Sequence, residues 1–105
     1  KPIIPQYFIS NDSTVVEKIV HSAVNKITSN GHPQLRAIAY ALGGYVSAEY
    51  ISEHDAITLI NKCIDNNSYL ARRTTGMNMA DVYKTTAKTM VIKGQSEKLF
   101  IDGKI

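Results

Sequence analysis

Three histidines and one cysteine are the side chains of this sequence best suited to hold a metal ion. They are His21, His32, His54 and Cys63. No two of them have the close spacing that is typical of structural zinc ligands. Cys63 falls on an apolar helical stripe, where a free cysteine usually behaves as a small core residue. The sequence therefore predicts neither a metal site nor a cofactor.

Residues for covalent or acid–base catalysis are also not arranged in any local motif. A nucleophilic Ser, Cys or Thr needs a base and an orienting group, and a sequence such as G-x-S-x-G is absent. Glu53 and Asp55 lie in the first turn of a predicted helix, where the helix dipole favours carboxylates. Gly43 and Gly44 lack the strand-loop-helix setting of a phosphate loop. We therefore predict that the domain is not itself catalytic.

Positive charge is concentrated in the last third of the chain. The net charge is +3. Residues 70–105 contain seven Lys or Arg and three Asp or Glu residues, whereas residues 1–69 contain five and six. An uneven distribution of this kind favours an anionic partner at the C-terminal part of the domain.

One group of these cations could contact a phosphate backbone. Its members are Arg72, Arg73, Lys84, Lys88 and Lys93. Lys84 and Lys88 are one helical turn apart, and Thr85 and Thr89 on the same predicted helix could add hydroxyl contacts. Tyr69, beside Arg72, could stack on a base or belong to the core. The alternative for the whole group is a solvated helix face that keeps the domain soluble.

Four amphipathic helices are expected to carry these side chains. Apolar residues recur at helical spacing over residues 14–29, 33–48, 53–65 and 78–93. Thr14 with Glu17, and Ser52 with Asp55, have the spacing of N-terminal capping boxes. The turn between the second and third helices is short, which predicts an antiparallel or angled helical hairpin.

Gly43 and Gly44 lie inside the second predicted helix. Each glycine costs about 0.5–1 kcal/mol relative to alanine there, so a local benefit should offset it. We predict that a neighbouring helix approaches closely at this point.

Three segments remain outside the predicted helices. Residues 1–12, with Pro2 and Pro5, favour an extended lead-in or linker. Residues 68–78 are typical of a loop, with one short helical turn near Tyr69. Leu99 to Ile101 could pair with Tyr7 to Ile9 as two short strands or simply pack on the bundle.

The 105 residues suit a single domain, which we place at 13–105. The predicted fold class is an all-α bundle of four main helices, with a short two-stranded pairing of the termini left open. The sequence contains no apolar run that could span a bilayer, and its single cysteine suits a reducing compartment, so we expect a cytoplasmic protein without a membrane partner. The initial lysine suits a fragment excised from a longer chain.

Residues 31–101 resemble a helical module that follows the primase or primase-polymerase domain in replication proteins of phages, plasmids and other mobile elements. The resemblance begins with Gly31-His32 and Leu35-Arg36-Ala37 and continues in Ala41-Leu42-Gly43-Gly44-Tyr45-Val46-Ser47-Ala48. It extends through Ile51-Ser52-Glu53, Tyr83-Lys84-Thr85-Thr86, Gly94 and Leu99-Phe100-Ile101. About two thirds of the chain is covered.

The resemblance implies an accessory role in DNA replication, in which the domain contacts nucleic acid or couples a primase to a helicase. By position, His32 and Arg36 would then belong to the entrance of the second helix and join the nucleic-acid-binding set, although His32 could equally be a polar cap beside Pro33. The partners would be single-stranded or duplex DNA and the adjacent primase or helicase domain of the same chain, and the parent protein would be a primase or primase-helicase.

Two further interpretations compete with this hypothesis. The domain could be an interdomain or protein-interaction module without nucleic-acid affinity, and an apolar patch around Tyr45, Tyr50 and Phe100 would then be exposed. A sequence-specific regulator built on the second and third helices is less consistent with the charges. Its candidate recognition helix holds three acidic residues against the single cation Lys62.

Overall fold

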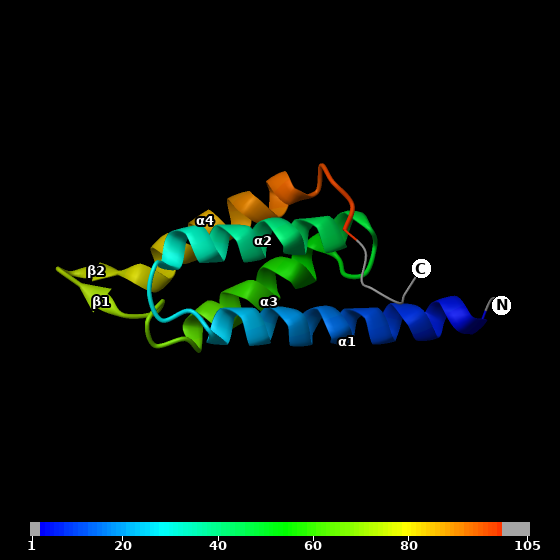
Figure 1. Ribbon diagram of the computed structural model, residues 1–105, viewed down its shortest axis with the longest axis horizontal. Helices are drawn as coiled ribbons and strands as arrows, with labels where there is room; N and C mark the ends of the chain where they lie inside the picture. The colour runs from blue at the N-terminus through cyan, green and yellow to red at the C-terminus, as the bar shows by residue number, and fades with distance from the viewer. Residues whose placement is uncertain (1–2, 100–105) are drawn as a thin grey trace.

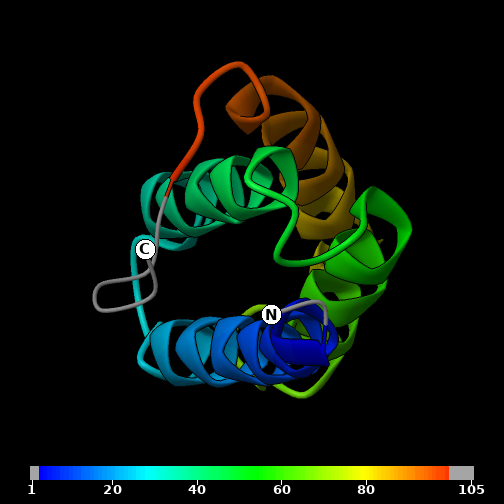
Figure 2. The same ribbon diagram turned by 90° about the vertical axis from the view of Figure 1, so that its right-hand side faces the viewer.

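The computed structural model describes residues 3–99, with side chains from residue 13 onward (Figure 1). The elements are helices α1 (Ile3–Asn25), α2 (Gly31–Ser47) and α3 (Glu53–Asp65), strands β1 (Arg73–Thr74) and β2 (Met77–Asn78), and helix α4 (Met79–Gly94). The helices lie along the long axis, and each runs opposite to the one before it (Figure 1). Viewed end-on, their order around the bundle is α1, α2, α4, α3 (Figure 2). The predicted all-α bundle is confirmed.

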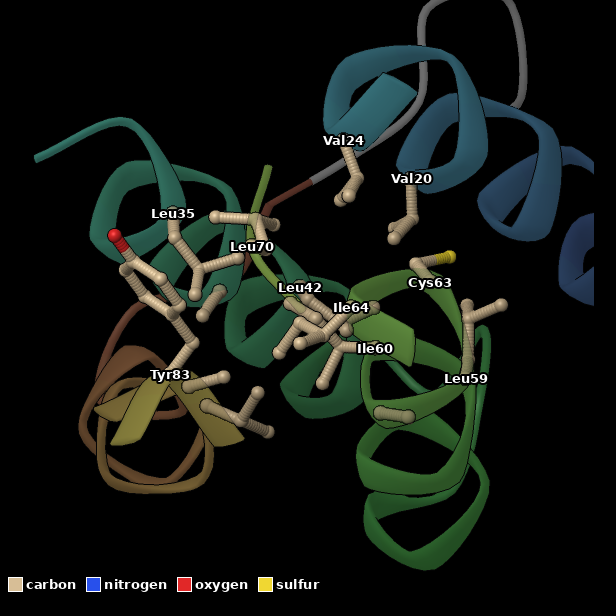
Figure 3. Close-up of a cluster of buried hydrophobic side chains, with 14 of the residues drawn as sticks. Val20, Val24, Leu35, Leu42, Leu59, Ile60, Cys63, Ile64, Leu70 and Tyr83 are labelled. Carbon is tan, nitrogen blue, oxygen red and sulfur yellow. The ribbon is translucent and has the colours of Figure 1, made fainter. Parts of the chain in front are cut away.

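The core is formed by the apolar stripes of all four helices (Figure 3). Its fully buried side chains include Val20 and Val24 of α1, Leu35 and Leu42 of α2, Ile60, Cys63 and Ile64 of α3, and Tyr83 of α4, together with Leu70. Burial of each large apolar side chain contributes about 1.5–3 kcal/mol before the cost of chain ordering. The helical spacing of these residues is therefore what fixes which face of each helix turns inward.

Small residues allow α2 and α4 to pack backbone against backbone. A Cβ atom at Gly43 would collide with the carbonyl oxygen of Val91, and one at Gly94 would collide with that of Tyr40. The close helix approach predicted at the Gly43-Gly44 pair is thus confirmed. This contact offsets the conformational cost of the glycines.

The predicted helix boundaries agree with the structure to within one or two residues for α2, α3 and α4. At the start of α3, the Ser52 hydroxyl oxygen accepts a hydrogen bond from the backbone N–H of Asp55 at 3.1 Å. The predicted cap is therefore present. It satisfies one of the amide donors that a helix leaves open at its N-terminus.

Helix α1 departs most from the sequence-based prediction. Residues 3–12 belong to the helix, so their assignment to an extended lead-in is wrong, and Thr14 is an interior residue rather than a cap. Pro5 falls in the first turn, where its missing N–H has no intrahelical partner to lose. The helix ends at Asn25, four residues earlier than predicted.

The connection between α3 and α4 contains a β-hairpin that the sequence analysis did not predict. It did predict a helical turn near Tyr69, and the N–H of Ala71 bonds the carbonyl of Asn67 at 2.9 Å as that turn requires. The strand pairing proposed for the termini is wrong at residues 7–9, which are helical. Phe100 and Ile101 lie outside the described residues. Among the described helices, none combines the length and the apolar character needed to cross a membrane.

Candidate nucleic-acid interface

The hairpin projects past the end of the helical bundle (Figure 1). Its strands are antiparallel, with Arg73 opposite Asn78 and Thr74 opposite Met77. The two turn residues, Thr75 and Gly76, both have positive φ angles, 49° and 76°, which is the pattern of a type I′ turn. All residues from 73 to 77 are exposed. The hairpin is therefore accessible to a partner from several sides.

Charge is polarised along the long axis of the molecule. The hairpin end comprises the loops and the first or last helical turns at residues 26–34 and 62–82. Its cations are Lys26, Lys62, Arg72 and Arg73, against Asp65 and Asp81. The described part of the opposite end carries Lys93 and Lys98 against Glu49, Glu53, Asp55 and Glu97. An anionic partner is therefore attracted to the hairpin end and repelled from the other.

The two arginines at the base of the hairpin have different environments. Arg72 folds back on the preceding turn, where its Nη1 donates to the carbonyl oxygen of Tyr69 at 2.7 Å. Its guanidinium carbon lies 4.0 Å from the centre of the Tyr69 ring, within the range of a cation–π contact. Arg73 is exposed and forms no ion pair with any residue whose side chain is described. The guanidinium group of Arg73 is thus the freer of the two.

The lysines of α4 do not form one face. Lys84 and Lys88 are separated by about 40° around the helix, but Lys93 lies about 140° beyond Lys88. Lys84 is also engaged, because its Nζ lies 2.8 Å from Oδ1 of Asp65. Lys88 and Lys93 are exposed. The structure therefore divides these predicted site residues between two sides of α4.

The threonines of α4 hydrogen-bond to their own helix. The Thr85 hydroxyl donates to the carbonyl of Asp81, and the Thr89 hydroxyl donates to that of Thr85, both at 3.1 Å. Each hydroxyl hydrogen is thus committed to an intrahelical bond. A ligand could meet only the hydroxyl lone pairs.

His32 and Arg36 lie on α2, away from the hairpin tip. The ring of His32 packs on Tyr83 with centroids 4.6 Å apart, and a Cβ at Gly31 would meet the same tyrosine. Arg36 is exposed and borders a groove described below. His32 therefore has a packing role between α2 and α4.

Asn67 is a structural residue that the sequence analysis did not single out. Its amide nitrogen donates to the carbonyl oxygens of Val24 at 2.8 Å and Ile27 at 3.1 Å. Its amide oxygen accepts from the N–H groups of Tyr69 and Leu70 at 2.9 and 3.0 Å. Asn67 thereby ties the end of α1 to the segment that leads into the hairpin. The only local signal was an Asn-Asn pair after a helix, which is also typical of a simple stop.

Two of the four metal-ligand candidates do meet. The sulfur of Cys63 lies 3.4 Å from Nδ1 of His21. Burial raises the pKa of the Cys63 thiol from 9.0 to about 11, so it is protonated at neutral pH. Within the described part of the chain, no group of three His, Cys, Asp or Glu residues could hold a metal ion.

An apolar groove runs beside α2 at the level of the segment that follows α4. It has a volume of about 490 Å³, and its lining includes Tyr40, Met90 and Leu99, with Arg36 at its edge. This groove does not lie at Tyr45 and Tyr50, where an exposed apolar patch was expected. Tyr50 is buried, Tyr45 is half-buried, and their rings pack edge to face at 6.0 Å.

Comparison of the chain with protein-family models, with curated proteins and with solved structures found no match. Inferences about its function therefore rest on the geometry and the charges of the chain itself. Several residues that carry the resemblance to the replication module, including Gly31, Gly43 and Gly94, lie in the contact between α2 and α4. Their packing role accounts for them without a ligand.

Proposed function

We propose that this domain is a non-catalytic accessory module that contacts the phosphate backbone of nucleic acid through its hairpin end. Arg73 and Lys26 are the leading contacts, and Arg72 assists them. Lys84 and Lys88 follow the hairpin end along α4, whereas Arg36 and Lys93 lie outside it. His32 belongs to the hairpin end, but its ring packs on Tyr83. The resemblance to the replication module suggests that the parent protein acts in DNA replication and that this domain lies beside its primase or helicase domain.

One observation carries this proposal: the exposed hairpin with its free arginine lies at the end of the molecule where cations outnumber acids. Clustered cations release counterions from a nucleic acid when they bind, which makes affinity depend steeply on salt. A merely solvated helix face needs no such clustering on a projecting element. The type I′ turn also places Arg73 on a short, well-defined ribbon rather than on a variable loop.

The test is a titration of the chain into fluorescently labelled single-stranded and duplex DNA at about 50 and 200 mM salt. A Lys26→Ala and Arg73→Ala double variant should bind more weakly at the lower salt and show a smaller salt slope. A Lys93→Ala and Lys98→Ala double variant is the matched control, because it removes the same charge from the opposite end. Equal losses in both would indicate a non-specific effect of net charge and contradict the proposal.

A second candidate function, interdomain contact without nucleic-acid affinity, is favoured by the apolar groove beside α2. Apolar lining of this size is a common property of contact surfaces. Absence of DNA binding at the lower salt would support this candidate. A Met90→Glu variant that separates the domain from its neighbour in the parent chain would then support it further.

A further inference from the structure

A polar depression lies at the hairpin end, between the ends of α1 and α3 and the segment that follows α3. Its volume is about 210 Å³, and its lining includes Asn25, Thr28, Asn66, Ser68 and Tyr69. The first four of these residues are exposed, and none of their side chains is used in a hydrogen bond among residues 13–99. Amide and hydroxyl groups that both donate and accept are therefore available around one small space.

The frame of this depression is fixed by buried hydrogen bonds. Asn67 also lines it and is only 7% exposed. Its four bonds hold the end of α1 against the segment that carries Tyr69. A ligand would consequently meet a preformed site and would not have to order these segments on binding.

Tyr69 is the aromatic residue that lines the depression, and it is partly buried against the core. Arg72 holds this residue through the cation–π contact at 4.0 Å and the hydrogen bond to its carbonyl at 2.7 Å. A guanidinium pinned in this way also remains a phosphate ligand, because its other N–H donors are not bonded to any described residue. Tyr69 and the two adjacent arginines thus belong to one short segment, and the polar groups come from this segment and from the ends of α1 and α3.

We propose that this depression receives one unpaired base of a single-stranded nucleic acid. The base would lie against the part of the Tyr69 ring that Arg72 does not cover, and its polar edge would face Asn66 and Thr28. Arg72 and Arg73 would hold the flanking phosphates. The inference rests on the proposed function and adds to it the class of substrate. Bases in a duplex are paired and stacked, so only single strands can insert one at low cost.

Two probes separate base recognition from phosphate contact. The first is a labelled oligothymidylate of about 12 nucleotides, a length within the usual range of single-strand sites. The second has the same backbone but abasic sugars. Because stacking on an aromatic side chain is worth roughly tenfold or more in affinity per base, the abasic strand should bind at least that much more weakly. A single 2-aminopurine in the first strand should lose fluorescence on binding as it stacks.

The variants report on the two kinds of contact separately. Tyr69→Leu should remove most of the preference for the base-containing strand, whereas Tyr69→Phe, the matched control, should retain it. Asn66→Ala and Thr28→Ala change exposed side chains and leave the fold intact, and they should reduce the same preference. Arg73→Ala should weaken the binding of both strands by a similar factor.

Equal affinity of the unaltered protein for the base-containing and the abasic strand, on both deoxyribose and ribose backbones, would overturn the base-binding site while leaving phosphate contact in place. An unchanged preference in both Tyr69→Leu and Asn66→Ala would also overturn it. Absence of binding to either strand at the lower salt would remove the proposed function together with this inference. The same two strands built on ribose then distinguish RNA from DNA as the ligand. The proposal requires that removal of the bases weakens binding in at least one of the two pairs, deoxyribose or ribose.

Discussion

Gly94 of α4 lies so close to Tyr40 of α2 that a Cβ atom at residue 94 would collide with the Tyr40 carbonyl oxygen. The obstacle is backbone, which cannot rotate away as a side chain can. With Gly43 against Val91, this contact fixes how deeply α4 sits on α2. Helix α4 in turn leads out of the hairpin, so the α2–α4 contact also sets where the candidate interface lies.

A Gly94→Ala substitution tests this contact. Helix propensity alone would stabilise the variant by about 1 kcal/mol. The collision forces the two helices apart, which costs about 1–3 kcal/mol or more in a packed interior. We expect a net loss of about 1 kcal/mol or more in the free energy of unfolding, measured by urea denaturation. The control Thr89→Ala, on the exposed side of α4, should change stability by less than about 0.5 kcal/mol. A Gly94→Ala variant as stable as the original would refute the contact.

Asn67 and Asn61 should respond in opposite ways to loss of their amides. Asn67 makes four hydrogen bonds, and each is worth about 0.5–1.5 kcal/mol net, so Asn67→Ala should destabilise by about 2–6 kcal/mol. Asn61 has a buried side-chain oxygen without a hydrogen-bond partner among the described residues. Asn61→Leu should therefore be neutral or stabilising by up to about 1 kcal/mol. Similar losses in both variants, measured by thermal unfolding, would contradict this assignment.

Local signals were sufficient for the parts of the fold that depend on local chemistry. Ser52 and Asp55 predicted the start of α3, and the Gly43-Gly44 pair predicted the close helix contact. The hairpin was missed because its turn is Thr75-Gly76, and a threonine at positive φ is not a recognisable turn signal. The sequence does not predict the helical start of α1 because proline usually breaks a helix, although the first turn tolerates it, as at Pro5.

The candidate site could be predicted only in part, because its geometry depends on contacts between distant residues. The sequence predicted that Arg72, Arg73 and the α4 lysines form one group, because they are near one another along the chain. It could not reveal that Lys84 pairs with Asp65 across two helices, or that Lys26 lies at the same end as Arg73. The depression beside Tyr69 likewise forms from three segments that are distant in sequence and that the buried Asn67 ties together.

Cys63 makes stability fall in alkaline solution. Its pKa in the folded protein is about 11, above the ordinary value of 9.0, because burial disfavours the thiolate. Below pH 9 the thiol is mostly protonated in both the folded and the unfolded state, so its full contribution to the free energy of unfolding is present. As pH rises from 9 to 11, the unfolded chain loses this proton first, so the free energy of unfolding decreases by roughly 3 kcal/mol in total.

A Cys63→Ala variant should lack this part of the pH dependence. Urea unfolding at several values between pH 8 and 11 should give a flatter profile for the variant than for the original protein. Contributions that the two proteins share cancel in the difference between the profiles. Parallel profiles would mean that the thiol ionises as easily in the folded state as in the unfolded one.

Thr75 stores backbone strain at the tip of the hairpin. Its φ angle is 49°, a left-handed conformation that costs a β-branched residue about 1–2 kcal/mol. Asparagine adopts this conformation readily, and Asn-Gly is the preferred sequence of a type I′ turn. Thr75→Asn should therefore relieve this strain and raise the free energy of unfolding by about 1 kcal/mol. The gain should register in global unfolding because the N–H of Met79 bonds the Arg72 carbonyl and so links the hairpin base to α4. The control is Thr74→Asn, at a strand position, which should give no gain. The free energies of unfolding of the two variants are measured by chemical denaturation. An equal change in both would exclude a left-handed residue at position 75.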